Sequence, residues 1–246
     1  KSKTYGEVNP ALTAVVTGTV GSDTLAYSLA TTATESSGVG PYPIAVTLGS
    51  NPNYDVSTTD AILSDPAIDA ILIATSTDTH SDLIERATGA GKAVLCEKPV
   101  DLSLARAQAC QKVAAKNGKP VMIGFNRRFD PNFSALKAAV DKGEIGKPEL
   151  LSITSFDPAP PPVAYIKVSG GLFRDMMIHD FDMANFVMGA APVTVSAVGT
   201  SIVDPAIGAV GDVDTAVVTL TYADGRIAVI KNSRRAGYGY DQRLEL

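Results

Sequence analysis

The sequence predicts an α/β plus α+β fold: a parallel sheet with helices, then a second domain on a mixed or antiparallel open sheet, preceded by a small all-β segment. Short apolar runs alternate with helical segments between residues 60 and 124, which is typical of a parallel sheet. Longer strand-like segments surround one helix beyond residue 150. Residues 1–56 contain 15 Ser plus Thr, six charged residues and no helical periodicity, so they are predicted to be β-rich.

Charge is divided unevenly along the chain. Of the 21 Lys and Arg residues, only Lys1 and Lys3 precede Arg86. Such asymmetry suggests two modules of different origin, and we place the boundary between them near residues 55–59.

The first module contains two β-branched runs, at 13–17 and 43–48, between glycine-rich turns, which predict a small antiparallel unit. After it the chain is expected to alternate helix and strand. The expected order is the end of a helix at 59–63, strand 70–74, helix 81–90, strand 93–96, helix 102–117, strand 121–124 and helix 132–142. This order implies right-handed crossovers and a parallel sheet.

The second domain is predicted from four longer strand-like segments and one helix. The strands, which look antiparallel, are at 150–155, 193–199, 215–222 and 226–231, and the helix is at 175–188. Asp224 and Gly225 between the last two strands predict a hairpin turn. Residues 243–246 are interpreted as the start of a further strand.

Composition excludes several classes of protein. With 246 residues, of which 45% are hydrophobic and 19% charged, the chain can bury a core and is neither disordered nor collagen-like. A net charge of −5 gives no footprint for nucleic acid, and no apolar run is long enough to span a membrane. The two cysteines, Cys96 and Cys110, cannot form a disulfide framework or a four-ligand zinc site, and no metal site is predicted. Because the chain begins with Lys1 and shows no signal peptide, we interpret it as a fragment or a processed product.

Polar loops follow three consecutive predicted strands. Glu97 and Lys98 come directly after the strand that ends at Cys96, and the loops 75–80 and 126–130 follow the other two. In an open parallel sheet, ligands bind at the carboxyl ends of the strands, so three such loops together favour a ligand site. Taken alone, Glu97 and Lys98 are better explained as a surface ion pair, and that alternative stays open at this point.

A second candidate cluster lies at the start of the helix predicted at 175–188. Asp175 and His179 are four residues apart, so on a helix they share a face, and Asp182 shares that side. A carboxylate one turn from an imidazole can orient the ring and raise its basicity. The alternative is an acid-rich first turn that interacts favourably with the helix dipole.

Several motifs after residue 56 carry a family resemblance. They are Asp69–Thr75 with Thr79 and His80, Cys96–Pro99, Gly124–Pro131, Gly170 and Gly171 with Asp175 and His179–Asp182, and Asn232–Arg243. Over residues 57–246 the chain thereby resembles the glucose-fructose oxidoreductase / inositol 2-dehydrogenase / rhizopine catabolism family, in particular its inositol 2-dehydrogenase branch. The resemblance implies the remainder of a dinucleotide-binding domain, a partial Rossmann-like parallel sheet, over residues 57–128. A truncated substrate and oligomerisation domain would occupy residues 129–246.

The resemblance also implies an activity: NAD(P)-dependent oxidation of a polyol or sugar hydroxyl to a ketone by hydride transfer. Lys98 would hold the reacting hydroxyl, His179 would be the general base, and Asp175 would support the proton transfer. The implied substrate-binding residues are Arg127, Arg128, Asp182 and Tyr240, and the implied cofactor-binding residues are Thr75, Ser76, His80, Glu97 and Lys98. NAD or NADP would be the cofactor. The family commonly forms dimers or tetramers, so a homo-oligomer is one expectation, and the enzyme part would be cytoplasmic.

The family's cofactor site begins with G-x-G-x-x-G in the first βαβ unit. The nearest candidate, residues 16–21, lacks the first glycine, and no acidic residue follows the strand at 43–48. Residues 1–56 instead resemble the MBG repeat of bacterial surface adhesins, on the stretches 3–12, 21–25, 39–44 and 51–54. The chain is therefore interpreted as a chimera with impaired dehydrogenase activity. The alternatives are a non-catalytic bacterial surface protein, located at the cell surface, or an inactive chimera.

Overall fold

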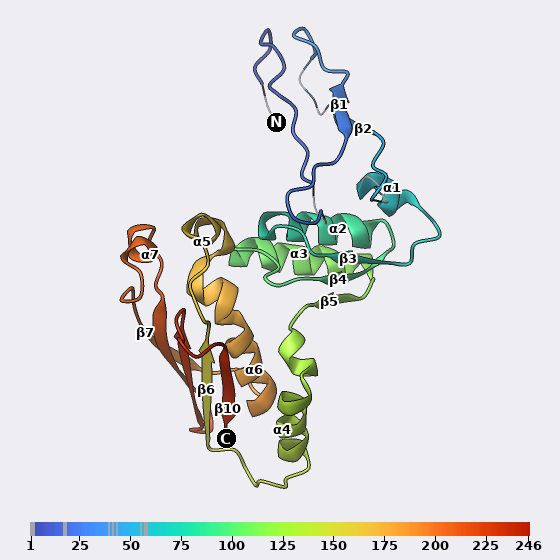
Figure 1. The fold of residues 1–246 in the computed structure, drawn as a ribbon. Coiled ribbons are helices and arrows are strands. Elements are labelled where there is room, and N and C mark those ends of the chain that lie inside the picture. The colour runs from blue at the N-terminus through green and yellow to red at the C-terminus, as the bar shows by residue number, and fades with distance from the viewer. Residues whose placement is uncertain are drawn as a thin grey trace. The chain divides into compact units, whose positions relative to one another are not determined.

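The structure is a computed structural model of the chain. It describes residues 3–16, 19–38, 40, 42, 44–54, 56 and 59–246. The chain divides into two compact units: unit 1, Lys1–Asp69, and unit 2, Ala70–Leu246. The predicted fold class is confirmed, because unit 2 contains a Rossmann-like parallel sheet and a separate mixed sheet (Figure 1). The finer division into segments 1–56, 57–128 and 129–246 stays a prediction.

Unit 1 contains a two-stranded antiparallel sheet and a short helix. Strand β1 (Tyr27–Thr31) pairs with β2 (Ile44–Leu48), so that Tyr27 faces Leu48. Helix α1 spans Thr59–Ser64. The predicted antiparallel pairing and the strand at 44–48 are confirmed, and Pro43 lies outside the described residues.

The strand predicted at 13–17 is wrong over residues 13–16, which have no regular structure, and Thr17 lies outside the described residues. Val15 is 72% exposed there. A β-branched run forms a strand only where it packs against a partner, and strand propensity alone does not supply one. The partner of β2 is instead β1, at residues 27–31.

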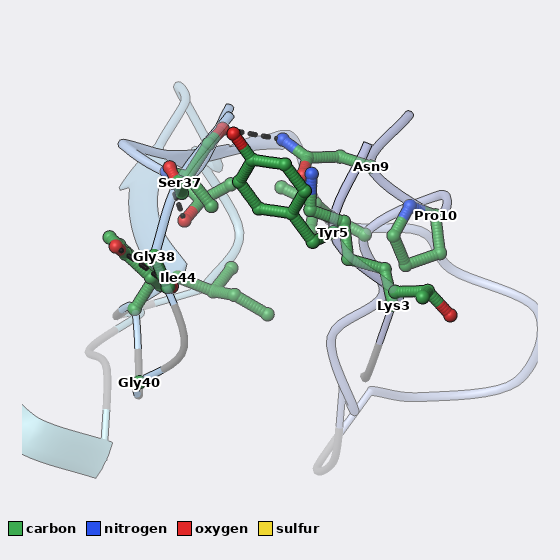
Figure 2. Close-up of a pocket in the computed structure, with 13 residues that line it drawn as sticks. Lys3, Tyr5, Asn9, Pro10, Ser37, Gly38, Gly40 and Ile44 are labelled. Carbon is green, nitrogen blue, oxygen red and sulfur yellow. Dashed lines mark hydrogen bonds between the residues drawn. The ribbon is translucent and has the colours of Figure 1, made fainter. Parts of the chain in front are cut away.

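A cavity of about 430 Å³ lies within unit 1 (Figure 2). Lys3, Tyr5 and Asn9 line one part of it, and Ser37, Gly38 and Ile44 line another. The Nζ atom of Lys3 donates to the carbonyl oxygens of Glu7 and Thr34, and the amide of Asn9 donates to the carbonyl oxygen of Ala33. The side-chain donors of Lys3 and Asn9 are thus used within the unit, and no predicted site residue lines the cavity.

Unit 2 begins with a three-stranded parallel sheet in the order β3-β4-β5. The strands are β3 (Ala70–Ile73), β4 (Ala93–Cys96) and β5 (Val121–Ile123), and the crossover helices are α2 (His80–Gly89) and α3 (Leu104–Asn117). Short 3-10 turns follow β3 at Thr77–Thr79 and β5 at Asn126–Phe129. The predicted alternation of helix and strand is confirmed here.

One face of the parallel sheet carries an apolar row. Leu72, Leu95 and Met122 face one another in register on neighbouring strands. They are 67%, 41% and 46% exposed. Ile73 and Cys96 point to the opposite face, where α2 packs, and are buried. An uncovered apolar face of this kind promotes association.

The second sheet of unit 2 has the strand order β10-β6-β9-β8-β7. Its strands are β6 (Leu150–Phe156), β7 (Thr194–Thr200), β8 (Thr215–Thr221), β9 (Ile227–Ser233) and β10 (Asp241–Glu245). The antiparallel interpretation is wrong for one pair, because β6 and β9 run parallel. A long connection lets the chain return to the same end of the sheet before β9. The hairpin at Asp224 and Gly225 and the strand near the carboxyl end are confirmed.

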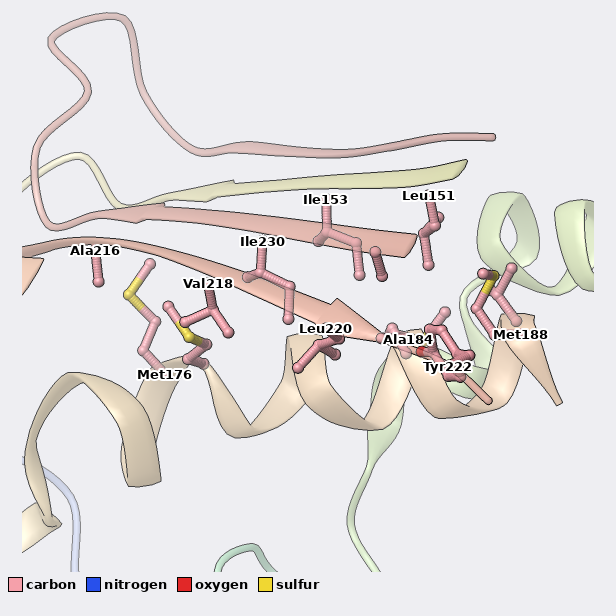
Figure 3. Packing of buried hydrophobic residues seen from close by; sticks show 14 of the residues in the cluster. Leu151, Ile153, Met176, Ala184, Met188, Ala216, Val218, Leu220, Tyr222 and Ile230 are labelled. Atoms are coloured by element: carbon pink, nitrogen blue, oxygen red, sulfur yellow. The ribbon is translucent and has the colours of Figure 1, made fainter. Parts of the chain in front are cut away.

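Helix α6 (Ile178–Met188) packs on one face of this sheet and closes the main core (Figure 3). Ile153, Val218 and Ile230 come from the sheet and are fully buried, as are Met183 and Ala184 of the helix. Each of the isoleucine, valine and methionine side chains contributes roughly 1.5–3 kcal/mol of hydrophobic stabilisation. The remaining helices of unit 2 are α4 (Pro131–Asp141), α5 (Val163–Ser169) and α7 (Pro205–Ala209).

The helix predicted at 175–188 is wrong at its start. A wide π turn spans Leu172–Met176, and the α-helix begins only at Ile178. The backbone nitrogen of Met177 donates to the carbonyl oxygen of Leu172, five residues earlier, at 2.8 Å. Asp175 therefore lies in the π turn, while His179 lies in the first turn of α6.

Two further observations concern the residues that the structure describes. Among their helices, none combines the length and the hydropathy that a membrane crossing requires. Within the same residues, no group of three or more His, Cys, Asp or Glu side chains is arranged to hold a metal ion.

Candidate active site

The site is organised by a contact between Lys98, just after β4, and Asp175 in the π turn. The Nζ atom of Lys98 donates to the backbone oxygen of Asp175 (2.6 Å) and to its Oδ1 atom (3.0 Å). The hydroxyl of Tyr165 donates to the same Oδ1 atom at 3.0 Å. Both charged side chains are mostly buried, with 16% and 14% exposure. The alternative interpretation, a surface ion pair between Lys98 and Glu97, is therefore wrong. Lys98 pairs instead with the carboxylate of Asp175, 77 residues away.

His179 lies beside this pair in a partly buried place. Burial, together with the positive charges of Arg127 and Lys98, lowers the pKa of His179 to about 4, against the opposing effect of Asp175. The Nδ1 atom is buried and has no hydrogen-bond partner among the described residues. The ring of Phe125 meets the imidazole edge-on, with centroids 6.3 Å apart. At neutral pH the imidazole is therefore uncharged and able to accept a proton.

Arg127 is held by buried acceptors rather than by solvent. It forms an ion pair with Asp180 and donates to Oγ of Ser155 at 3.0 Å. Asp180 is fully buried and also accepts from the amide of Asn232 (2.8 Å). Burial raises the pKa of Asp180, against the opposing effects of Arg127 and Asn232. Since Arg127 is among the charges that act on His179, this network fixes a positive charge near the imidazole.

Arg128 and Asp182 form a second, more exposed pair. Nε and Nη2 of Arg128 donate to the two carboxylate oxygens of Asp182 at 2.8 and 2.6 Å. The guanidinium also lies over the ring of Phe186, 5.0 Å from its centroid. Tyr240 is not brought into this group: it is 73% exposed before β10 and makes no hydrogen bond with the described part of the chain.

On the predicted cofactor side, His80 joins two strand-end loops. Its Nδ1 atom lies 2.7 Å from the carbonyl oxygen of Pro99, and its Nε2 atom lies 3.0 Å from that of Thr75. The hydroxyl of Thr79 lies 2.6 Å from the Thr75 hydroxyl and donates to the carbonyl oxygen of Ser76 (2.8 Å). Both nitrogens of the His80 ring are used inside the protein, so the ring shapes the loops.

Glu97 lies where the ends of β4 and β5 approach each other. Its backbone nitrogen donates to the carbonyl oxygen of Ile73 (2.9 Å), which extends the pairing with β3. Gly124 donates to the carbonyl oxygen of Cys96 at 2.7 Å, and a Cβ atom on Gly124 would lie 3.2 Å from Oε2 of Glu97. The glycine thus leaves room for this carboxylate at the strand ends.

Three residues of the site are missed by sequence reasoning: Tyr165, Asp157 and Arg234. Burial and the neighbouring Asp175 raise the pKa of Tyr165 to about 12. Burial also raises the pKa of Asp157, against the charges of Arg234 and Arg127. Asp157 directly follows β6, so the rule that polar residues at strand ends form sites could have found it. Nothing in the local sequence marks Tyr165. Arg234 lies within the motif 232–243, but no feature of that motif sets it apart as a site residue.

The strand ends of unit 2 fit only part of a dinucleotide. Lys98, Glu97 and the hydroxyl groups of Thr75 and Ser76 offer donors and acceptors for a ribose and a nicotinamide amide. A pyrophosphate site needs a glycine-rich turn between a strand and a helix. In the described part of unit 1, the strands form an antiparallel pair and no such turn is present.

A parallel sheet with polar strand ends, linked through a lysine–aspartate contact to a mixed sheet, defines a two-part α/β protein of the Rossmann-like class. Residues 32–125 match the family described as "Oxidoreductase family, NAD-binding Rossmann fold". Residues 133–246 match the "GFO/IDH/MocA C-terminal domain". The chain belongs to the Gfo/Idh/MocA oxidoreductase family.

Known proteins of the inositol 2-dehydrogenase group are similar to this chain. The inositol 2-dehydrogenase of Rhizobium meliloti is 56% identical over 192 residues, which cover 78% of this chain and 58% of that protein. The myo-inositol 2-dehydrogenase of Thermotoga maritima is 54% identical over 185 residues, covering 75% of this chain and 55% of that protein. The chain thus spans little more than half the length of the curated relatives it matches.

Solved structures give the same result. A myo-inositol dehydrogenase from Corynebacterium glutamicum is 46% identical with a TM-score of 0.73, over 77% of this chain and 56% of that one. A scyllo-inositol dehydrogenase from Lactobacillus casei, solved with NAD(H) and scyllo-inositol, is 31% identical with a TM-score of 0.69, over 76% and 57% of the two chains. The predicted cofactor class, NAD or NADP, is confirmed at the level of the family.

The family match begins at residue 32. It therefore reaches into residues 1–56, which the sequence resemblance assigns to an adhesin repeat, and extends the family beyond the predicted limit at residue 57.

Proposed function

We propose that this chain is an oxidoreductase of the inositol 2-dehydrogenase type, which oxidises a polyol or sugar hydroxyl to a ketone with NAD or NADP. The observation that carries the proposal is the cluster of Lys98, Asp175 and His179 at the carboxyl end of β4. The identity to inositol 2-dehydrogenases supports the substrate class.

In the proposed reaction, the chain positions one hydroxyl and removes its proton. The Nζ atom of Lys98 donates a hydrogen bond to the hydroxyl oxygen and stabilises negative charge as the O–H bond breaks. The uncharged imidazole of His179 takes the proton. NAD or NADP, when bound, would accept the hydride that leaves the carbon atom of the same C–OH group. Asp175 holds Lys98 in place through two hydrogen bonds and compensates the imidazolium charge.

The remaining predicted residues would recognise the other hydroxyl groups. A polyol presents many donors and acceptors, so a pocket that holds it needs both charged and neutral polar groups. Arg128 and Asp182 are already paired, and each retains further hydrogen-bonding capacity. We assign them, with Arg127 and Tyr240, to substrate binding.

We further propose that dinucleotide binding is weak in this chain. The candidate stretch 16–21 lacks the first glycine of the fingerprint, and the described strands of unit 1 form an antiparallel pair. Among the described residues of unit 1, no glycine-rich turn joins a strand to a helix N-terminus, so the main anion site for a pyrophosphate is not seen there. The expected result is a dissociation constant for NADH well above that of relatives that carry the glycine fingerprint.

Titration of the purified full chain with NADH, followed by nicotinamide fluorescence, tests both proposals. Saturable binding, together with oxidation of myo-inositol measured as NADH formation, supports the dehydrogenase assignment. Absence of saturable binding at millimolar NADH contradicts it. Lys98→Ala and His179→Ala should each abolish most of the oxidation, whereas Lys112→Ala on exposed α3 serves as the matched control.

A second candidate function is a non-catalytic role at the bacterial surface through an adhesin-like repeat. The antiparallel pair of β1 and β2, which belongs to a compact unit of its own, favours it. Its test is whether the chain, although folded, lacks NADH binding while the segment upstream in the gene encodes further β repeats and a signal peptide. A cytoplasmic location and a homo-oligomer are the corresponding expectations for the enzyme, and size-exclusion chromatography with light scattering checks the latter.

A further inference from the structure

We propose that Arg234 is a positioning residue for the candidate active site and acts through Asp212 on the turn that carries Asp175. The inference rests on the proposed function, since it concerns how Asp175 is held opposite Lys98. Arg234 directly follows β9, away from every residue that the sequence marks as catalytic.

The guanidinium of Arg234 is buried in unit 2. The residue is 1% exposed, and its backbone nitrogen donates to the carbonyl oxygen of Asp214 at 2.8 Å. Its Nε and Nη2 atoms are buried and form no hydrogen bond with the described residues. A buried cation is costly unless opposite charges compensate it, so the carboxylates around it determine what it stabilises.

Asp212 is the carboxylate in ion-pair contact with this cation. Its Oδ2 atom lies 4.0 Å from Nη2 of Arg234. Both oxygens of Asp212 also accept from the backbone nitrogen of Leu172, each at 3.1 Å. Leu172 is the first residue of the π turn, so this carboxylate caps the turn at its start. The position of the cation thus determines the position of the cap.

Gly171 allows the backbone to approach Asp212 this closely. Its φ angle is +74°, and a Cβ atom there would lie 2.4 Å from Oδ1 of Asp212. A side chain at this position would displace either the carboxylate or the turn. The backbone conformation at Gly171 therefore brings the turn into contact with Asp212.

Asp175 is the residue of the turn that this arrangement places. Its backbone oxygen and Oδ1 atom both accept from Lys98, so a small shift of the turn disturbs two hydrogen bonds together. The charge of Arg234 also opposes the burial that raises the pKa of Asp157 and of Tyr165. A displacement of about 1 Å in such a site can lower the rate roughly 100-fold.

The first test compares Arg234→Met, Arg234→Lys and Asp212→Asn in the full chain, with the neighbouring exposed Arg235→Met as the matched control. We expect Arg234→Met and Asp212→Asn to lower kcat for inositol oxidation about 10- to 100-fold with a much smaller change in KM. Arg234→Lys, which keeps the charge, should restore most of kcat. Wild-type kcat in Arg234→Met, or an equal loss in Arg235→Met, would overturn the proposal.

The second test does not depend on turnover. In Arg234→Met, amide hydrogen exchange at Leu172 and Met177 should accelerate at least about tenfold, while amides of β8 keep their wild-type rates. Equal acceleration throughout unit 2 would mean general destabilisation and would also overturn the proposal. If the wild-type chain shows no oxidation, the proposed function fails by itself, and the exchange rates still decide whether Arg234 positions the turn.

Discussion

The ammonium group of Lys98 lies 2.6 Å from the carbonyl oxygen of Asp175 and 3.0 Å from its Oδ1 atom. The two residues are 77 positions apart, and the contact joins the end of a parallel strand to a π turn beside the second sheet. Because the carboxylate also accepts from Tyr165, its lone pairs are directed by two donors. The lysine is therefore held in one geometry before any ligand binds.

Replacing Lys98 should remove catalysis without unfolding the chain. Lys98→Ala is expected to lower kcat/KM for inositol oxidation by about 10³-fold, since a positioned donor is lost where charge develops. Lys98→Arg should remain strongly impaired, because the planar guanidinium cannot occupy the place of a compact ammonium group. Steady-state kinetics with NAD measures both effects.

Thermal unfolding of the same Lys98 variants provides the control. Lys98→Ala should still unfold in one cooperative transition, at a lower melting temperature than the wild type because Asp175 loses its cation, whereas Lys112→Ala should keep the wild-type melting temperature. A variant that keeps more than about one tenth of the wild-type kcat/KM would contradict the role assigned to Lys98.

The depressed pKa of His179 predicts acid sensitivity of the fold. The pKa is about 4 in the folded chain and about 6.5 in the unfolded chain, so protons bind the unfolded chain preferentially between these values. The free energy of unfolding should fall as the pH drops from about 6.5 to 4. After allowance for solvent screening, His179 accounts for about 2 kcal/mol of that loss.

Urea denaturation of wild type and His179→Gln at pH 7 and pH 4.5 measures this effect. The glutamine variant should lose less stability on acidification, although its stability at pH 7 need not match. Parallel pH profiles for the two proteins would show that protonation of His179 does not destabilise the fold.

The two neighbouring arginines should differ sharply in their contribution to stability. Arg127→Met leaves the fully buried Asp180 without its cation, and breaking such a pair costs roughly 3–5 kcal/mol. Arg128→Met breaks an ion pair whose arginine side chain is 42% exposed, and an exposed pair of this kind contributes at most about 1 kcal/mol. Chemical denaturation of the two variants tests the difference, and equal losses would rule out the buried network around Asp180.

Gly171 and Gly189 allow a comparison of steric and conformational effects. Both have positive φ angles, +74° and +66°, so alanine is strained at either position. At Gly189 nothing lies within 4 Å of the added Cβ atom, whereas at Gly171 Asp212 would lie 2.4 Å away. Gly171→Ala should therefore cost clearly more than the roughly 1 kcal/mol expected of Gly189→Ala. If both variants lost the same unfolding free energy, Asp212 would not lie close enough to exclude a Cβ atom at position 171.

Local patterns predict the parallel sheet and much of the site. Short apolar runs such as 93–96 and 121–124 are too short and too uniformly apolar for a surface helix, and they fit buried strands of a parallel sheet. In such a sheet, the polar residues that bind ligands follow the carboxyl ends of the strands. That rule alone brings Lys98 and the loop after β5 to the same edge of the sheet. The contact of Lys98 with Asp175 itself depends on how two sheets pack, and only the family resemblance anticipates it.

The features that sequence reasoning misses all depend on distant partners. The fully buried Asp180 is stable there because Arg127 and Asn232 reach it, 53 and 52 positions away. The parallel pairing of β6 with β9 follows from the path of the chain between them and not from the composition of either strand. Likewise, the π turn is capped by Asp212, which lies 40 positions from Leu172. The spacing of Asp175 and His179, taken alone, predicts an ordinary α-helix.

The π turn also has a consequence for insertions and deletions. An α-helix advances by about 100° per residue, so removing one residue from Leu172–Met176 would rotate α6 by that angle relative to the turn's first residue. His179 would then move out of its present position, in which the charge of Lys98 acts on it, while the core face of α6 would turn away from Leu220 and Ile230. This short stretch is therefore expected to accept many changes of side chain and no change of length.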